Sequence, residues 1–505
     1  MLIIAAFACE KPGNEEPSSS KNISANRSRI VLDNFHRYDT VTVEAEGEWV
    51  VGFYPYSTEI SVQKIIGSPN KFIASSTSEL TDGVDRTATI IVQPVNSTDT
   101  TALYIPFVRL AVPKDTIVFG GQGNDVFNDI INSSVNGLLA VGYSESNDGD
   151  GGQGHGGKDL WVVKMSVDGK KQWSKKFGGS QDEAATCIVS SYKQEDMTSY
   201  FDGYIIGGYT YSNDGDVTGN HGQKDAWLIK IDTLGNLVWQ KTFGTAGDDG
   251  IVQLMNGSAP GALVCGTRND DQWLMKLDPA GNIKWEKTFG SSGIDLAGGI
   301  TETMAGYYFT GSGKFQDGDV ADKPTSSYDA WGVKIGKEDG QTHWVRYIGG
   351  SADDKGLFLA GFYNMEVMLI GTTESNDIFP EFYGQRNIFA AFYDVDGNLL
   401  WKKIIKHTKW DEPAVLGGSK FGNLIIAGKS KNPQSTSNDE SAFNASLIVM
   451  TPTGDVIRSR IFEGPGPSCI TGMTAAGFSK PFVGYSSGVA TGTNLDGYFG
   501  WFDYR

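Results

Sequence analysis

One stretch, residues 224–244, recurs in edited form from about residue 115 to the C-terminus. It contains a β-strand pattern, a tight turn at residues 234–236 and a second strand that ends at glycine, so it predicts a β-hairpin. A hairpin that repeats along a chain is typical of a solenoid, a propeller or another repeat array. The repeat therefore predicts an all-β fold.

The hairpin occurs in seven copies, and each copy opens its first strand with Asp or Asn. The opening residues are Asp159, Asp225, Asp271, Asp329, Asn387, Asn444 and Asp496. The second strand carries Trp and, four residues later, Phe or Ile in the first five copies, a spacing that places both side chains on one face, where they can pack between neighbouring sheets. Two further strands lie between hairpins, for example residues 204–209 and 366–371. Four strands in seven copies predict a seven-bladed β-propeller over residues 114–505.

The two ends of this repeat region complement each other. We name the strands of each copy A to D, so that the hairpin is strands C and D. The last copy, residues 496–503, is a strand C with no strand D after it, whereas residues 116–119 match a strand D with no strand C before it. We therefore expect the propeller to close by pairing these two segments, which would satisfy both exposed edges.

Composition limits the possible partners. The net charge is −18 and the sequence pI is about 4.8, whereas binding to nucleic acid needs clustered Lys and Arg. We expect no nucleic-acid partner and a monomeric chain. Besides Cys9, the cysteines are Cys187, Cys265 and Cys469, which lie in strand-like contexts without metal-binding spacing, and we expect buried free thiols.

The N-terminus is an apolar run, residues 1–9, that ends in small residues and Cys9. Residues 6–9 resemble the lipobox of bacterial lipoproteins, which implies a truncated lipoprotein signal, acylation of Cys9 and a location at the outer membrane or cell surface, with the membrane contacted only through this anchor. The alternative is an apolar leader with an incidental cysteine. Residues 10–27 are rich in Pro, Glu and Ser, which is typical of a flexible tether.

Residues 28–113 have a different pattern, with short strands at turn-punctuated intervals. This pattern predicts a small immunoglobulin-like β-sandwich. Residues 46–51 and 85–90 resemble the BACON-type domains of surface glycan-handling lipoproteins. Within the first segment, Trp49 could be a sugar platform, but a single Trp in a strand is more typical of a core residue. We expect the domain to act as a spacer.

The repeats also resemble the pyrroloquinoline-quinone-like propeller repeats of bacteria, through the turn-to-Trp patterns of residues 167–173 and 395–401. The quinone dehydrogenases of that group usually have eight blades and an adjacent cysteine pair. This chain has seven copies and no adjacent cysteines, so the resemblance implies the fold and leaves a redox activity doubtful.

Two sets of acidic residues recur in the connections between strands. One set follows strand D and begins strand A: Asp125, Glu183, Asp249, Asp295, Asp354 and Asp411, with Ser468 in the seventh copy. We expect these to cap turns. The other set lies in the B–C loops within Asn-Asp-Gly-Asp or Gln-Asp-Gly-Asp motifs: Asp148, Asp150, Asp214, Asp216, Asp317 and Asp319. Their clustered oxygens on a glycine-rich backbone predict a calcium site, and an Asx-rich turn is the alternative. His155 and His221 follow two of these loops, where they can bond to their own loop or bind a ligand.

The fifth B–C loop differs from the others because it is rich in aromatic residues. Phe379, Phe382, Tyr383 and Arg386 lie in or at the end of this loop, and Trp410 lies in the adjacent D–A connection. Exposed aromatic side chains at one rim are typical of a binding surface. These five residues are the predicted ligand-binding site, with stacking on sugars or docking of a protein as the two uses, and packing of one loop against the other as the alternative.

Two classes of function follow. The first, which we favour, is a non-catalytic binding or scaffold module at the cell surface that recognises a glycan or a protein through the B–C and D–A loops. The second is an enzyme, either a propeller-type glycan lyase or hydrolase that uses loop carboxylates, or a quinone-linked dehydrogenase. A glycoside hydrolase needs two carboxylates at a defined separation, which a sequence does not give.

Overall fold

The computed structural model of the chain describes part of the N-terminal region and most of the repeat region. The described residues are 23–25, 30–32, 38–45, 49–54, 60–64, 70–76, 86–94, 103–109 and 117–503, the last range without 134–136, 167–168, 196–197, 259–260, 324, 338–339, 363, 406, 419–422, 432–442, 463–467, 475–478 and 488–494. The predicted signal, Cys9 and almost all of the tether lie outside these residues. No helix among the described residues is long and apolar enough to cross a membrane.

The chain divides into two compact units, with a boundary between Lys114 and Asp115. The first unit contains two four-stranded sheets, ordered β1-β3-β6-β5 and β2-β8-β7-β4. Their strands are β1 (Ile23–Ala25), β2 (Ile30–Leu32), β3 (Tyr38–Ala45), β4 (Trp49–Tyr54), β5 (Ile60–Lys64), β6 (Lys71–Ser76), β7 (Arg86–Pro94) and β8 (Leu103–Arg109). Trp49 is 3% exposed and meets Phe72 edge to face, with ring centroids 6.1 Å apart. It is therefore a core residue, as expected, and not a sugar platform.

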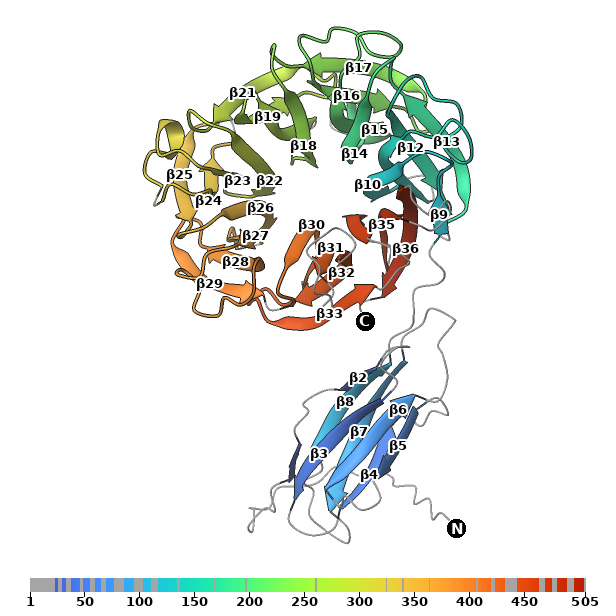
Figure 1. The fold of residues 1–505 in the computed structure, drawn as a ribbon, viewed down its shortest axis with the longest axis vertical. Helices are drawn as coiled ribbons and strands as arrows, with labels where there is room; N and C mark the ends of the chain where they lie inside the picture. Colours follow the sequence, from blue (N-terminus) through green and yellow to red (C-terminus); the bar gives the residue numbers. More distant parts are fainter. Residues whose placement is uncertain are drawn as a thin grey trace. The chain divides into compact units, whose positions relative to one another are not determined.

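The second unit is a ring of repeated four-stranded antiparallel sheets, the arrangement of a β-propeller (Figure 1). Among its described residues there are seven such sheets, which we number 1 to 7 in chain order. Sheet 1 contains β10 (Asp125–Asn132), β11 (Leu138–Ser144), β12 (Asp159–Met165) and β13 (Lys171–Phe177). Sheet 2 contains β14 (Glu183–Glu195), β15 (Thr198–Thr210), β16 (Asp225–Ile231) and β17 (Leu237–Phe243). Sheet 3 contains β18 (Asp249–Asn256), β19 (Ala262–Arg268), β20 (Asp271–Leu277) and β21 (Ile283–Phe289).

The remaining sheets follow the same order. Sheet 4 contains β22 (Asp295–Thr303), β23 (Gly306–Gly313), β24 (Asp329–Ile335) and β25 (Thr342–Ile348), with a short 3-10 turn, η1 (Gly318–Val320), before β24; sheet 5 contains β26 (Asp354–Gly361), β27 (Val367–Thr373), β28 (Asn387–Tyr393) and β29 (Leu399–Ile405); sheet 6 contains β30 (Asp411–Gly418), β31 (Leu424–Lys431), β32 (Phe443–Met450) and β33 (Val456–Phe462); and sheet 7 contains β34 (Ser468–Met473), β35 (Ser479–Ser487), β36 (Leu495–Asp503) and β9 (Ile117–Phe119). In sheets 1 to 6, strand A is the innermost strand (Figure 1).

Sheet 7 joins the two ends of the ring. Strand β36 pairs antiparallel with β9, and Phe499, Tyr498 and Gly497 face Ile117, Val118 and Phe119. The predicted pairing of the segment at residues 116–119 with the last strand is therefore present for residues 117–119, which are the described part of that segment. It gives residues 497–499 of β36 a hydrogen-bonded neighbour on their second side, which covers part of an edge that would otherwise be open to pairing with another chain.

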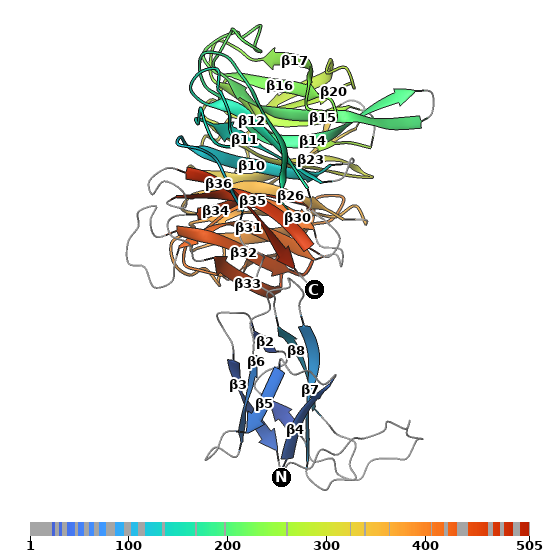
Figure 2. The ribbon, with the colours of Figure 1, turned by 90° about the vertical axis from the view of Figure 1, so that its right-hand side faces the viewer.

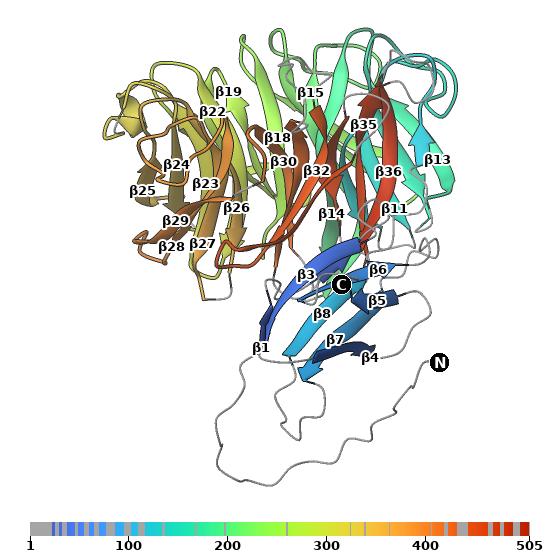
Figure 3. The ribbon, with the colours of Figure 1, turned by 60° about the horizontal axis from the view of Figure 1, so that its bottom comes forward.

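Aromatic side chains pack the sheets against one another. Trp239 and Phe243, which are four residues apart on strand D, both pack against the core cluster that sheets 2 and 3 share, as their spacing predicts. Phe243 of sheet 2 meets Trp273 of sheet 3, with ring centroids 6.2 Å apart, and Phe289 of sheet 3 meets Trp331 of sheet 4 at 5.6 Å. The tilted view of Figure 3 shows sheets 4 and 5 side by side. The long hairpin β14–β15 extends beyond the other strands of the ring (Figure 2). Cys187, Cys265 and Cys469 are buried free thiols, as expected.

Candidate functional site

Neighbouring sheets meet at junctions, where strand D of one sheet turns into strand A of the next. The acidic residue that begins strand A is buried and accepts a backbone N–H from this connection. The donors are Gly121 to Asp125, Gly179 to Glu183, Thr245 to Asp249, Ser291 to Asp295, Gly350 to Asp354 and Thr408 to Asp411. The interpretation of these six residues as turn-capping groups is therefore confirmed.

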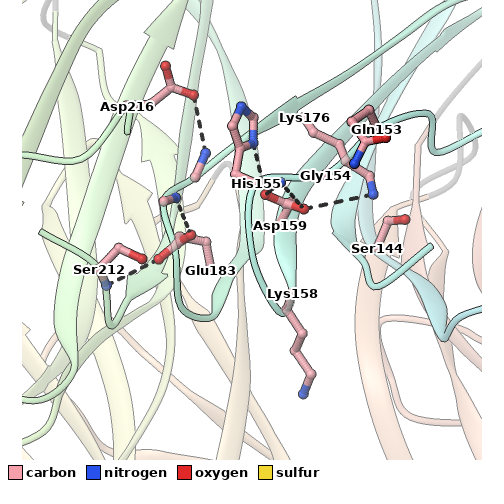
Figure 4. A network of polar contacts seen from close by, with 12 residues as sticks. Ser144, Gln153, Gly154, His155, Lys158, Asp159, Lys176, Glu183, Ser212 and Asp216 are labelled. Carbon is pink, nitrogen blue, oxygen red and sulfur yellow. Dashed lines mark hydrogen bonds and ion pairs between the residues drawn. The ribbon is translucent and has the colours of Figure 1, made fainter. Parts of the chain in front are cut away.

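At junction 1/2, the carboxylate that opens strand C of sheet 1, Asp159, lies near the one that begins strand A of sheet 2, Glu183 (Figure 4). Asp159, which opens strand C of sheet 1, accepts the N–H of His155 at 3.0 Å and lies 3.8 Å from the ammonium of Lys176, whose side chain is 2% exposed. Glu183 belongs to sheet 2. A Cβ on Gly178 would lie 2.4 Å from Glu183 Oε2 and 3.1 Å from Asp159 Oδ1. The two carboxylates thus flank one glycine, which leaves the space that a side chain would fill.

The junctions differ in how these negative charges are compensated. In junction 4/5 the buried ammonium of Lys323 lies 3.1 Å from Asp329. In junction 3/4 no described basic side chain forms an ion pair with Asp271 or Asp295, and burial, together with the charge of Asp271, raises the pKa of Asp295 to about 6. Burial likewise raises the pKa of Asp354 to about 6, with a further contribution from Asp329. Two negative charges close together in a buried site favour a bound proton.

The aspartates of the Asn-Asp-Gly-Asp and Gln-Asp-Gly-Asp loops fasten the D–A connections. Asp148, Asp214 and Asp317 each accept a backbone N–H from the D–A connection that enters their own sheet. Asp150, Asp216 and Asp319 accept the N–H of Gly120, Gly178 and Gly290 and donate their own N–H to the carbonyl of the same glycine. Among the described residues, no group of three or more His, Cys, Asp or Glu side chains could hold a metal ion. The alternative of an Asx-rich turn accounts for these aspartates, because each already serves a backbone donor.

His155 and His221 bond to their own loops. His155 Nδ1 lies 2.9 Å from Asp159 Oδ1, and His221 Nδ1 lies 2.8 Å from Asp225 Oδ2. Each histidine therefore has a carboxylate partner that begins the following strand C.

The aromatic residues of the fifth B–C loop do not form an exposed rim. Phe379 is 1% exposed and stacks on Phe389, with ring centroids 5.5 Å apart. Phe382 and Tyr383 are half-buried against the same core cluster, and Tyr383 Oη accepts the N–H of His407 at 2.6 Å. The expectation of exposure is therefore wrong for Phe379, and the alternative, packing of this loop on the adjacent connection, describes the arrangement.

Arg386 and Trp410 form a half-buried network at junction 5/6. Arg386 Nε and Nη2 donate to Glu374 Oε1 at 2.9 and 2.7 Å, and Nη1 donates to Glu412 Oε1 at 2.6 Å. The guanidinium lies over the Trp410 ring, 4.8 Å from its centroid. Arginine is well suited to this double role, because its planar group can bind carboxylates and stack on an aromatic ring together.

A polar cleft of about 450 Å³ opens at junction 4/5, on the side of the B–C and D–A loops. Its lining combines hydroxyl groups, two carboxylates and one ammonium group. The lining residues are Lys314, Thr325, Ser326, Ser327, Ser351, Ala352, Asp353 and Glu374. Since Glu374 also binds Arg386, the cleft adjoins the Arg386–Trp410 network. The structure therefore connects two of the predicted site residues with a cleft, while Phe379 lies in the core beside it.

The residues of this cleft were not predicted from the sequence. They come from the β23–β24 connection, the β25–β26 connection and the residue that follows β27, and serine and threonine in loops carry little information by themselves. One signal was available: Asp353 and Trp410 both directly precede the acidic residue of strand A, in sheets 5 and 6, so they hold equivalent places in neighbouring junctions. A comparison of the residues at this place would have drawn attention to junctions 4/5 and 5/6.

Comparisons with known proteins add only weak similarities. The sequence matches no protein-family model and no curated protein. Among solved structures, a lignostilbene dioxygenase from Pseudomonas brassicacearum has a TM-score of 0.38 at 10% identity and covers 73% of this chain and 87% of its own. A puromycin hydrolase has a TM-score of 0.37 at 10% identity and covers 80% of this chain and 56% of its own. An apocarotenoid oxygenase from Synechocystis has a TM-score of 0.36 at 9% identity, with coverages of 74% and 86%. At these TM-scores, none of the three bears on the fold or the function of this chain.

Proposed function

We propose that this chain is a non-catalytic binding protein of the cell surface that recognises a glycan in the junction 4/5 cleft. In this proposal Cys9 carries the lipid anchor, residues 10–27 are the tether, residues 28–113 form an immunoglobulin-like sandwich that acts as a spacer, and residues 114–505 form a seven-bladed propeller. The loop side of the propeller binds the ligand.

The chemistry of the cleft is the observation that carries the proposal. Its volume of about 450 Å³ lies within the range of small-molecule sites, roughly 300–1,000 Å³. Carboxylates such as Asp353 and Glu374 accept hydrogen bonds, and hydroxyls such as those of Thr325 and Ser327 both donate and accept them. A sugar presents several hydroxyl groups on a small ring and therefore matches this lining. Among the two partners expected from the sequence, the cleft favours a glycan over a protein, whose interfaces centre on aromatic and apolar anchors.

A binding role also suits the carboxylates better than catalysis. A glycoside hydrolase needs an acid with a raised pKa beside the scissile bond. Asp295 and Asp354 have raised pKa values, but they are 1% and 0% exposed, so they do not contact a ligand in the cleft. Glu374, which lines the cleft, is already held by an ion pair with Arg386 at 2.7 Å.

A glycan array tests the proposal with the full chain and two variants of the cleft, Asp353→Asn and Glu374→Gln. Matched controls are Asp182→Asn and Glu145→Gln. Asp182 is the counterpart of Asp353: it accepts the N–H of Lys158 in junction 1/2, and Asp353 accepts the N–H of Tyr328 in junction 4/5. Glu145 is the counterpart of Glu374, because each directly follows strand B of its sheet. We expect about tenfold or greater loss of binding in each cleft variant, since a hydrogen bond to a charged group contributes roughly 1.5–3 kcal/mol, and no loss in the controls. Binding that is absent, or that survives both cleft substitutions, would overturn the proposal.

A further inference from the structure

Exposed apolar side chains of the propeller gather on one of its two faces. Because the strands of each sheet are antiparallel and ordered A to D, the A–B and C–D turns emerge on one face, which we name the turn face, and the B–C and D–A loops emerge on the other. Of the 14 large hydrophobic side chains that are exposed in the described part of the second unit, 11 lie at the turn face. The other three are Val252, Ile294 and Phe315. Single exposed hydrophobic residues are normal on a protein surface, but their concentration on one face needs a cause.

These side chains stand at separate turns around the ring. Leu234, in the C–D turn of sheet 2, is 68% exposed, and Met304, in the A–B turn of sheet 4, is 85% exposed. Tyr192 and Tyr200 are exposed on the β14–β15 hairpin, which extends beyond the other strands (Figure 2). Aliphatic residues are also exposed at the start of strand D in sheets 2, 3, 5 and 6: Leu237, Val238, Ile283, Leu399, Leu400 and Val456. The turn face therefore has a discontinuous apolar rim and not one compact patch.

Strand D repeats one order of side chains away from the turn face. In sheet 5, exposed Leu400 is followed by half-buried Trp401 and then by Lys403, whose ammonium lies 5.1 Å from the centroid of the Trp401 ring. Sheet 2 has the same order in Val238, Trp239 and Lys241. At about 3.3 Å per residue, the aliphatic and basic positions are roughly 10 Å apart along the strand. Aliphatic groups followed by Trp and then by Lys match a bilayer surface, because Trp prefers the headgroup level and Lys extends its charge into water.

The polypeptide also enters the propeller at the turn face. Strand β9, the first strand of the second unit, is strand D of sheet 7, and every strand D begins at the turn face. The residues that carry the anchor in the proposed function precede β9 and are therefore joined to the ring on this side. The cleft at junction 4/5 opens on the opposite face, among the B–C and D–A loops.

We propose that the turn face rests on a lipid bilayer, with its exposed aliphatic side chains inserted at the headgroup level and the cleft facing away. This inference rests on the membrane anchoring in the proposed function, and it adds a second membrane contact to the anchor, the single contact expected from the sequence. A planar bilayer contacts turns all around the ring at once. A protein partner would instead need a compact cluster of anchor residues.

The charge of the chain decides which lipid the turn face prefers. The C–D turns contain Asp232, Asp278 and Asp394, each of which accepts a backbone N–H within its own turn, and the net charge of the chain is −18. Anionic headgroups therefore repel the chain, and insertion of apolar side chains supplies the attraction. We expect stronger binding to zwitterionic phosphatidylcholine than to anionic lipid, with little weakening by salt.

Flotation of the full chain with phosphatidylcholine vesicles tests the proposal. The chain carries Cys9→Ser in every sample, so that no acyl group contributes. Leu399 and Leu400 are 46% and 49% exposed, so their double substitution by Ser should leave the fold intact and lower the partition coefficient about tenfold or more. The matched control, Ile294→Ser with Phe315→Ser, removes two exposed hydrophobic side chains away from the turn face and should leave the partition coefficient unchanged.

Three results would overturn the proposal. The first is a chain that does not float, or that floats equally well with and without the Leu399→Ser and Leu400→Ser substitutions. The second is a preference for anionic vesicles that salt abolishes, because basic and not aliphatic side chains would then drive binding. The third is self-association in analytical ultracentrifugation that the double substitution abolishes, without vesicle binding, which would assign the turn face to a second copy of the chain.

Hydrogen–deuterium exchange with the same vesicles locates the contact. Slower exchange at residues 232–238 and 396–400, with no change at residues 291–294, supports the turn face, and slower exchange at residues 291–294 alone would overturn it. The glycan array needs no lipid and the vesicle experiment needs no glycan, so the two proposals fail separately. Vesicle binding without glycan binding supports the bilayer contact and overturns the glycan site, and glycan binding without vesicle binding overturns the bilayer contact alone.

Discussion

Replacing Asp295 by Asn is expected to stabilise the ring at neutral pH and to have little effect in acid. Asp295 is 1% exposed and faces Asp271 across Gly290, on which a Cβ would lie 2.3 Å from Asp295 Oδ2 and 2.6 Å from Asp271 Oδ1. Its pKa is raised to about 6 from the ordinary 3.8. A carboxyl group with a raised pKa contributes stability below pH 4, and this contribution is lost as the pH rises through 6.

The magnitude follows from the pKa difference. At 1.36 kcal/mol for each pKa unit, a shift from 3.8 to about 6 corresponds to about 3 kcal/mol. The difference in unfolding free energy between Asp295→Asn and the unsubstituted chain should therefore shift by about 3 kcal/mol in favour of the variant between about pH 3 and pH 7.5. Urea unfolding followed by tryptophan fluorescence at several pH values measures this difference, and groups shared by both chains cancel. A difference that does not change with pH, or that changes in the opposite direction, would refute the reasoning.

Four further predictions concern the junctions and loops. Lys176→Met leaves Asp159 without its buried cation, so urea unfolding should show a loss of about 3–5 kcal/mol. Unchanged stability would mean that this ion pair is unimportant. Gly244→Ala places a Cβ 2.5 Å from Asp225 Oδ1 and 2.8 Å from Asp249 Oδ2, so the Tm of this variant should fall by several degrees. Gly418→Ala, where a Cβ has no neighbour within 4 Å, should not lower the Tm. Equal effects of the two substitutions would contradict this account. Phe379→Ala should lower the unfolding free energy by about 3–5 kcal/mol because the ring is buried, and a loss of glycan binding without a loss of stability would restore it as a contact residue. Chelation of calcium should leave the Tm unchanged, because the aspartates of the B–C loops bind backbone N–H groups, and a calcium-dependent rise in Tm would contradict that assignment.

Features that repeat along the chain could be predicted from the sequence. The hairpin copies, the Trp residues of strand C and the acidic residue that begins strand A recur at matched places, so an all-β repeat fold and a capping role for Glu183 or Asp411 could be inferred. The unmatched strands near residues 117 and 499 likewise indicated their pairing, which the register of β9 with β36 bears out.

Features that depend on which loops meet could not be predicted in the same way. Phe379 lies in a loop, and a loop is usually exposed, but this loop folds back so that the ring stacks on Phe389. Asp148 and Asp150 have the composition of a cation site, yet their partners are backbone groups of residues 120–122, which are distant in sequence. The cleft at junction 4/5 is built from separate connections, and only the folded ring brings Thr325, Asp353 and Glu374 together.

The most direct test of the proposed site is a hydrogen-exchange footprint of the full chain with a glycan that binds on the array. We predict that the glycan slows exchange in peptides covering residues 325–327 and 351–353, and leaves the equivalent connection of junction 1/2, residues 178–182, unchanged. Slowed exchange at another junction, with no slowing at junction 4/5, would contradict the assignment of the cleft as the binding site.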